Sequence, residues 1–296
     1  MVCSQGLPPD SPSWSPPGAE LLLGRLERAE FFGLTGFASR ARAVEDLELH
    51  VLDRLRWQGA RLTPSQQALA ARAESLRRRL EAQNARQVLT LRRQVRRGEL
   101  TQETLKQALL LSAGLPGPEG AYDALDLLVA SLLGGSGREA LPLEPEMVAF
   151  QPTPARAILQ LLERCALGPE DTLIDLGAGL GHVVILAALL SEARARGVER
   201  DPALCAAARR SARLLGAARA QFEEADARTA RLSDGTVFFL YTPFRGAMLQ
   251  EVLGRLQAEA RTRPIRVCTY GPCTAEVARA GWLRGGGPDP AVFLSA

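Results

Sequence analysis

A glycine-rich loop in the second half of the chain has the residue types and spacing of a ligand-binding turn. It follows the apolar run 172–174 and precedes a helical pattern that begins near His182. Glycine lets backbone N–H groups approach a ligand closely because no Cβ stands in the way, and the start of a helix offers further N–H groups. The residues assigned to this site are Asp175, Gly177, Ala178, Gly179 and Gly181.

The spacing of the glycines distinguishes two classes of ligand. Dinucleotide-binding folds use G-x-G-x-x-G, whose third glycine would fall at His182, whereas this chain has G-x-G-x-G and ends at Gly181. With Asp175 in front, the loop resembles the first motif, D/E-x-G-x-G-x-G, of the class I (Rossmann-like) S-adenosylmethionine-dependent methyltransferases. The resemblance implies that the loop wraps the methionine part of the cofactor S-adenosyl-L-methionine. It also implies that Asp175 orders the loop through backbone amides.

Two acidic residues, one at the end of the second predicted strand and one just after the third, extend the predicted cofactor site. Glu199 lies about 20 residues past the loop, where a carboxylate can accept hydrogen bonds from both hydroxyls of a ribose. This position suits methyltransferases and NAD enzymes equally. Asp226 follows the third predicted strand, and the resemblance implies that it contacts the adenine amino group.

The end of the fourth predicted strand is the candidate acceptor side. The resemblance places there residues that face both cofactor and substrate, so Tyr241 and Thr242 are the catalytic candidates, unless the strand merely turns at Pro243. Enzymes that methylate amino groups of DNA carry D/N/S-P-P-Y/F here. Tyr241 to Phe244 lack the first residue and the first proline of that motif, so DNA is not expected as the acceptor. The segment 175–184 also resembles the non-SET nucleosomal lysine methyltransferases, over the loop alone.

The C-terminal half alternates β-branched or aromatic runs with alanine-rich helical runs. Such alternation builds βαβ units and a parallel sheet. We predict an α/β fold in which an all-helical domain precedes a Rossmann-like methyltransferase sheet, mostly parallel, of seven strands with a C-terminal antiparallel hairpin. The predicted strands are 172–176, 196–199, 220–224, 236–241 and 265–270, with helices at about 181–191, 202–214, 246–260 and 274–280 and a hairpin within 282–295.

The N-terminal half shows a helical pattern. Residues 1–18 carry five prolines and are predicted to be a disordered tail, residues 19–140 a helical domain, and residues 141–296 the S-adenosylmethionine-binding domain. A capping box from Thr63 to Gln66 predicts the start of a helix of roughly 50 Å that stops at Gly98.

Arginine dominates this long helix and the residues before it. Between Arg54 and Arg97 stand 12 arginines and two acidic residues, a local balance of +10. Most of these arginines lie opposite the leucine stripe on the helical wheel. The helix 63–97 is therefore a candidate surface for an acidic protein or RNA, and the alternative is an ordinary solvated face.

Composition excludes several classes of protein. Hydrophobic residues make up 46% and charged residues 23%, as in soluble globular proteins. The apolar run 183–190 is too short to span a bilayer, and Met1 to Glu20 lack the features of a signal peptide, so we expect no membrane association and a cytoplasmic location. Five scattered cysteines and two distant histidines favour neither a disulfide framework nor a metal site.

These observations favour an S-adenosylmethionine-dependent methyltransferase of unknown acceptor, with a protein or small molecule favoured over DNA. An NAD-type oxidoreductase is one alternative, and His182 in place of the third glycine counts against it. A non-catalytic binding module on the same fold is the other alternative. The retention of Gly177, Gly179 and Gly181 together counts against that module.

Overall fold

The computed structural model describes residues 16–31, 33, 36–57, 62–115, 122–135 and 141–296, and these form two compact units. The helical unit comprises the described residues of Met1–Gln87 together with Ser112–Gly114. The sheet unit comprises those of Val88–Leu111 and Leu115–Ala296.

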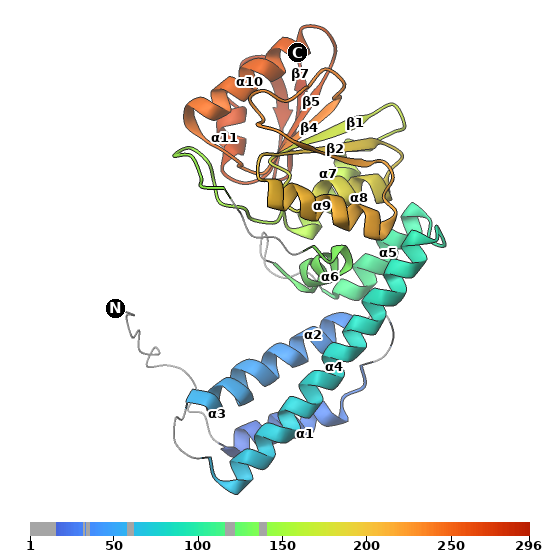
Figure 1. Cartoon of the computed structure of the whole chain (residues 1–296), viewed down its shortest axis with the longest axis vertical. Helices are drawn as coiled ribbons and strands as arrows, with labels where there is room; N and C mark the ends of the chain where they lie inside the picture. The colour runs from blue at the N-terminus through green and yellow to red at the C-terminus, as the bar shows by residue number, and fades with distance from the viewer. Residues whose placement is uncertain (1–15, 32, 34–35, 58–61, 116–121, 136–140) are drawn as a thin grey trace. The chain divides into compact units, whose positions relative to one another are not determined.

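The helical unit packs short helices against the first part of one long helix (Figure 1). Its elements are α1 (Pro16–Arg28), α2 (Gly36–Leu47), a π-helical turn (Glu48–Leu52), α3 (Asp53–Trp57) and the first part of α4 (Pro64–Arg96). Its core is formed by apolar side chains that are at most 5% exposed, among them Leu23, Leu47, Val51, Leu55, Leu69, Leu76 and Leu80.

The starts of α1 and α4 show how the sequence sets helix ends. Proline suits a first helical turn, where its missing N–H would have no partner. α1 therefore begins at Pro16, and the predicted disordered tail is wrong for residues 16–18, while residues 1–15 lie outside the described residues. At α4 the capping box is confirmed, because the Thr63 N–H donates to Gln66 Oε1 at 2.9 Å and the Gln66 N–H donates to Thr63 Oγ1 at 3.3 Å.

The sheet unit contains a seven-stranded sheet in the order β3-β2-β1-β4-β5-β7-β6. The first five strands are parallel to their neighbours, and β7 runs antiparallel to both β5 and β6, as predicted. The strands are β1 (Thr172–Leu176), β2 (Arg194–Glu199), β3 (Ala220–Glu224), β4 (Val237–Leu240), β5 (Arg266–Thr269), β6 (Leu283–Gly286) and β7 (Ala291–Ser295).

Helices cover both faces of the sheet (Figure 1). On one face lie α7 (Ala155–Cys165), α8 (His182–Leu190) and α9 (Pro202–Leu215), and on the other lie α10 (Gly246–Ala260) and α11 (Cys273–Val277). Side chains that alternate along β1 and β4, such as Ile174 and Phe238, pack with α10 in one fully buried cluster.

Two helices that the sequence assigned to the N-terminal domain belong to the sheet unit. These are α5 (Gln102–Ala113, apart from its last two residues) and α6 (Ala124–Leu133). α6 contacts α7, α8 and α9, and its leucines Leu125, Leu128, Leu132 and Leu133 are at most 1% exposed. The division between the units therefore falls inside α4, and not at residue 140 as the sequence pattern suggested.

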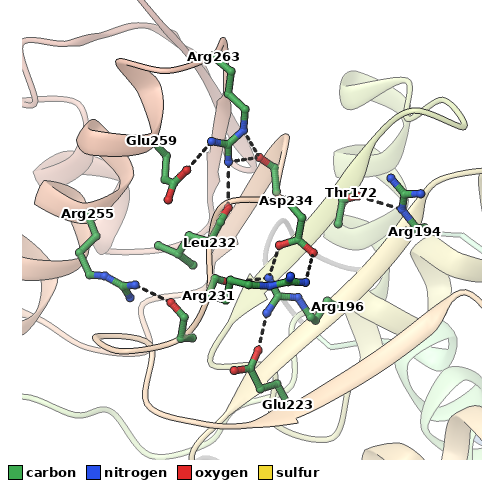
Figure 2. A network of polar contacts seen from close by, with 12 residues as sticks. Thr172, Arg194, Arg196, Glu223, Arg231, Leu232, Asp234, Arg255, Glu259 and Arg263 are labelled. Carbon is green, nitrogen blue, oxygen red and sulfur yellow. Dashed lines mark hydrogen bonds and ion pairs between the residues drawn. The ribbon is translucent and has the colours of Figure 1, made fainter.

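Three arginines form hydrogen bonds to backbone carbonyls of the loop between β3 and β4 (Figure 2). Arg255 on α10 donates to the carbonyls of Ala227 and Ala230, and Arg263 donates to those of Leu232 and Gly235. Arg196 on β2 bonds the Arg231 carbonyl and pairs with Glu223 and Asp234. Because a guanidinium has five donors in a fixed plane, each arginine satisfies several acceptors of the loop at once.

Candidate functional site

A cavity of about 330 Å³ opens at the carboxyl ends of the parallel strands in the sheet unit. In open α/β sheets, ligands bind at this edge, outside the strand ends. The walls come from the glycine loop, the ends of β2 and β4, and the segment 141–153. The predicted site residues that line it are Asp175, Gly177, Ala178, Glu199, Asp226, Tyr241 and Thr242, whereas Gly179 and Gly181 are not among its lining residues.

The three glycines of the loop are required by the protein's own packing. Gly177, Gly179 and Gly181 have φ angles of +93°, +53° and +79°, in the left-handed region that side chains rarely adopt. A Cβ on Gly179 would lie 2.2 Å from the ring of Phe150, and one on Gly181 would lie 2.5 Å from the ring of Phe222. Sequence reasoning assigned the glycines to ligand approach and missed these rings.

Glu199 holds the loop in place. Its Oε2 accepts the Gly179 N–H at 2.7 Å, and its Oε1 accepts the Asp201 N–H at 2.7 Å. The N–H groups of Gly177 and Ala178 donate to the Val198 carbonyl at 2.9 and 3.0 Å. Each Glu199 oxygen keeps a further lone pair, so the predicted bonds to ribose hydroxyls remain a prediction that this geometry permits.

The role that the family resemblance implied for Asp175, ordering of the loop through backbone amides, stays a prediction. No donor among the described residues lies within hydrogen-bond distance of its carboxylate, although the residue is only 4% exposed. Burial, with a smaller contribution from Glu199, raises the pKa of Asp175 to about 8. A buried carboxylate without a donor is costly unless a ligand supplies charge or hydrogen bonds. The cavity therefore suits a cationic ligand.

Asp226 lines the cavity but is engaged by a neighbour that the sequence did not reveal. Arg228 donates to both Asp226 oxygens at 2.6–3.1 Å, and its backbone N–H donates to Oδ1 at 2.8 Å. The Arg228 hydrogen bonds are the largest cause that lowers the pKa of Asp226. Arg228 also pairs with Glu144 at 3.2 Å. Contact between Asp226 and an adenine amino group stays a prediction.

Residues 141–150, here called the roof segment, form one wall of the cavity. The Leu141 N–H donates to Asp201 Oδ2 at 2.8 Å, and the Val148 N–H donates to the Pro243 carbonyl at 3.1 Å. The Glu146 carboxylate accepts the N–H groups of Ala247 and Met248 at the start of α10. The sequence pattern placed a domain boundary just before this segment and did not reveal that Glu146 anchors it to α10.

The two catalytic candidates differ in how their hydroxyls are used. Thr242 is 7% exposed, and its Oγ1 donates to the Tyr270 carbonyl at 3.2 Å and accepts the Cys273 N–H at 3.1 Å. Its φ of +42° is in a strained region for a β-branched residue, as occurs at functional sites. Tyr241 lines the cavity, and its ring meets that of Tyr270 edge-on with centroids 5.0 Å apart. Both residues line the cavity, but the Thr242 hydroxyl is already used to fix the turn.

His182 also lines the cavity, at the first position of α8. Burial lowers its pKa to about 4, so the imidazole is neutral at physiological pH. The sequence predicted a helix-start residue here, and the structure agrees.

Comparison with protein families adds a finding that agrees with this geometry. Residues 152–231 match the family described as histone methylation protein DOT1. The match spans β1, the glycine loop, Glu199 and Asp226. The chain is a class I S-adenosylmethionine-dependent methyltransferase. S-adenosyl-L-methionine is therefore its cofactor.

Solved structures similar to the methyltransferase include an RNA methyltransferase from Salinibacter ruber in complex with S-adenosyl-L-homocysteine. That structure is 28% identical, covers 49% of this chain and 92% of its own, and superposes with a TM-score of 0.40. A methyltransferase from Geobacter sulfurreducens is 17% identical, covers 49% of this chain and 78% of its own, and has a TM-score of 0.37. No curated protein sequence matches the chain.

Two features are absent from the described part of the methyltransferase. None of its helices there is long and apolar enough to cross a membrane. Within the same ranges, no three His, Cys, Asp or Glu side chains group so that they could hold a metal ion.

Proposed function

We propose that the methyl acceptor is an amine nitrogen of a protein side chain, a lysine. The observation that carries this proposal is the phenol of Tyr241, which lines the cavity at the end of β4 together with Phe150 and Pro243. Aromatic and proline rings suit the alkyl stem of a lysine, and a phenol oxygen accepts an N–H.

The placement of charge favours a neutral amine at this end. The carboxylates that line the cavity are Asp175, Glu199, Asp201 and Asp226, and all of them lie in or just after β1, β2 or β3. None of these cavity-lining carboxylates follows β4, so none among the described residues that line the cavity would hold an ammonium at that end. Transfer of an ammonium among aromatic side chains costs hydration free energy, which lowers its pKa and favours the neutral form. Only the neutral form has a lone pair to attack a methyl group.

The family match and the strand-end motif both favour protein over DNA. The matched family is described as methylating histones, which are proteins. The residues from Tyr241 to Phe244 lack the pattern of enzymes that methylate DNA amino groups.

Different residues of the cavity would bind the cofactor, exclude water and orient the acceptor. The bound cofactor supplies a methyl group already activated on a sulfonium, so positioning supplies much of the rate. The glycine loop and Glu199 are the groups that would hold it, and the roof segment excludes water from that side. The Tyr241 oxygen accepts an N–H of the amine and thereby orients the nitrogen lone pair.

The test is to incubate the whole chain with methyl-labelled cofactor and four acceptors separately: core histones, N-acetyl-lysine methylamide, RNA and DNA. We expect label in histones that is recovered as methyl-lysine after acid hydrolysis. Tyr241→Phe should lower kcat while the affinity for S-adenosyl-L-homocysteine stays within about twofold. Label recovered only in RNA, or as methyl-arginine, would overturn the lysine assignment.

We further propose that α4 contacts an acidic part of the protein acceptor. Several of its arginines are already paired, since Arg72 binds Glu20 and Glu27, and Arg77 binds Glu74 and Glu81. The arginines that pair with no carboxylate among the described residues include Arg79 and Arg86. Charge reversal at both positions should raise KM for the protein acceptor and leave KM for the lysine amide unchanged. An equal rise in KM for both acceptors would contradict this proposal.

A further inference from the structure

Two buried cysteines of the sheet unit face each other, although they are 103 residues apart in the sequence. Cys165 ends α7 and Cys268 lies on β5, and their sulfur atoms are 3.4 Å apart, within hydrogen-bond distance. The two residues are 2% and 0% exposed, and neither lines the cavity. The sequence gave no sign of this pair, because the packing of α7 on the sheet is what brings the two sulfurs together.

The backbone on both sides of the sulfur contact is anchored. Arg266 on β5 donates to the Cys165 carbonyl at 2.5 Å and thereby ties the end of α7 to this strand. Cys268 lies opposite Phe239 on β4 and Val292 on β7, in the interior of the sheet. The two thiols therefore meet at a fixed place and at a high effective concentration.

The contact makes the two sulfurs chemically different. The hydrogen bond between them lowers the pKa of Cys165 and raises that of Cys268, so Cys268 donates its S–H and Cys165 ionises first. The charge of Arg266 also lowers the pKa of Cys165. Because the thiolate and not the thiol is the nucleophile, Cys165 is the sulfur that attacks an oxidant.

We propose that Cys165 and Cys268 form a modification site at which hydrogen peroxide converts the two thiols into a disulfide. In the first step the Cys165 thiolate attacks one peroxide oxygen and displaces hydroxide, which leaves a sulfenic acid on Cys165. In the second step the Cys268 sulfur attacks the Cys165 sulfur, and the sulfenic oxygen leaves as water with the Cys268 proton. The hydroxide takes up the proton that Cys165 released, so two thiols and one peroxide give one disulfide and two waters.

Burial determines which oxidants reach this site. Hydrogen peroxide is little larger than water and enters through small fluctuations of the packing. Glutathione disulfide would have to form a mixed disulfide with Cys165, for which a residue that is 2% exposed leaves no room. Burial also makes the reaction slower than that of an exposed thiol of similar pKa.

The disulfide would stabilise the part of the fold that binds the cofactor. The chain between the two cysteines contains β1, the glycine loop, β2, β3 and β4. A link across so long a segment restricts the unfolded chain, and this effect grows with the length of the closed loop. Since neither cysteine lines the cavity, the oxidised protein should keep its affinity for S-adenosyl-L-homocysteine.

The first experiment treats the whole chain with hydrogen peroxide and maps its disulfides by mass spectrometry. Cleavage after arginine and tyrosine separates Cys165, Cys268 and Cys273 into three peptides. We expect the first two to appear linked, lighter by two hydrogen atoms and separable by dithiothreitol, while glutathione disulfide gives no link. Overoxidation of Cys165 without a link, or links spread over all the cysteines, would overturn the proposal. An equal yield with glutathione disulfide would overturn the role of burial.

The second experiment compares melting temperatures before and after peroxide treatment. The parent should gain about 5–15 °C. Cys165→Ala and Cys268→Ala should gain nothing, and each is compared with its own untreated form, so a lower starting stability does not matter. Cys205→Ala is the matched control, because Cys205 is fully buried but contacts no second sulfur among the described residues, and it should gain as much as the parent.

A gain that persists in either of the first two variants, or no gain in the parent, would overturn the proposal. Calorimetry on the oxidised parent should give an affinity for S-adenosyl-L-homocysteine within about twofold of the reduced form. A loss of more than about tenfold would overturn the placement of the disulfide outside the cofactor site. All of these measurements are independent of the methyl acceptor.

Discussion

The helical unit and the sheet unit each bury a charged side chain, but only the one in the helical unit is hydrogen-bonded by neighbouring described residues. In the helical unit Arg40 is 4% exposed, and its guanidinium donates to Asn84, Gln87 and the Phe31 carbonyl. In the sheet unit Asp175 is equally buried, and no donor among the described residues bonds its carboxylate. The first arrangement is a satisfied structural contact, whereas the second leaves a free-energy cost that a ligand removes.

Residues with positive φ angles also differ between the two units in how closely their neighbours pack. The sheet unit places Thr242 at a φ of +42° beside the cavity, and its loop glycines are crowded by the rings of Phe150 and Phe222. In the helical unit Gly33 also has a positive φ, of +68°, but no atom lies within 4 Å of where its Cβ would be. The candidate site therefore coincides with residues whose backbone conformation or buried charge is unfavourable in the protein alone. The changes below are ordered from the largest to the smallest expected effect on cofactor affinity.

The largest effect is expected from truncation. Residues 141–296 lack α6, whose leucines Leu125, Leu128 and Leu132 are fully buried in the sheet unit, so this fragment should aggregate or fail to bind S-adenosyl-L-homocysteine. Residues 88–296 retain α6 and should bind it within about twofold of the whole chain. Size-exclusion chromatography and calorimetry on both fragments check this. A soluble 141–296 fragment with full affinity would place α6 outside the binding unit.

Gly179→Val should lower the affinity for S-adenosyl-L-homocysteine by more than about tenfold. The added side chain would collide with Phe150, and a side chain at this positive φ carries a strain of about 1–3 kcal/mol, so the loop must move. Gly33→Val is the matched control, with a similar φ but open space and a place in the other unit. It should leave the affinity unchanged. Equal losses in the two variants would mean that the effect is global unfolding.

Glu199→Gln should weaken cofactor binding roughly tenfold to a hundredfold, as expected for lost charge-assisted hydrogen bonds. The structure adds a second effect, because an amide cannot accept the N–H groups of both Gly179 and Asp201 on separate oxygens. The melting temperature without ligand should therefore fall as well. Glu74→Gln in the helical unit is the control, and unchanged affinity for both variants would remove Glu199 from the site.

A pH dependence is expected from Asp175. Its pKa in the folded protein is about 8, above the ordinary value of 3.8, so the folded state holds this proton more tightly than the unfolded chain. This contribution to stability is complete below about pH 4 and is lost as pH rises to about 8. Since a cationic cofactor favours the carboxylate, binding should release a proton, and affinity should rise by up to about tenfold per pH unit between pH 6 and 8.

Asp175→Asn should remove both pH dependences and stabilise the protein without ligand at pH 8. Calorimetry in buffers of different ionisation enthalpy measures the proton release directly. A parent protein whose affinity is flat over this range would show that Asp175 keeps its proton in the complex.

The smallest effect on affinity is expected from the core of the helical unit. Leu47 is fully buried there, and Leu47→Ala should destabilise that unit by about 2–5 kcal/mol. Affinity for S-adenosyl-L-homocysteine should stay within about twofold, because every residue that lines the cavity lies in the sheet unit. Hydrogen exchange resolved by residue measures the stability loss. A parallel loss of affinity would show that the two units are energetically coupled.

Periodic signals made most of the fold predictable. The alternation of strands and helices specified the parallel sheet, and the capping box specified the start of α4. The boundary at residue 140 was not predictable in this way, because glycines and prolines mark a change of local structure and not a change of packing partner. α6 is a helix by local pattern, but its leucines are buried against helices that begin at residue 155 and later.

The sequence by itself determined the glycine loop, the position of Glu199 at the end of the next strand and the absence of a DNA-type motif after β4. These are local features, each defined by residues within a few positions of one another. Only the tertiary structure decided that Phe150 covers Gly179, that Glu199 accepts the Gly179 N–H of the loop, and that the ring of Tyr270 meets that of Tyr241. Each of these contacts joins elements distant along the chain, and strand order and helix packing, which a local pattern does not encode, bring them together.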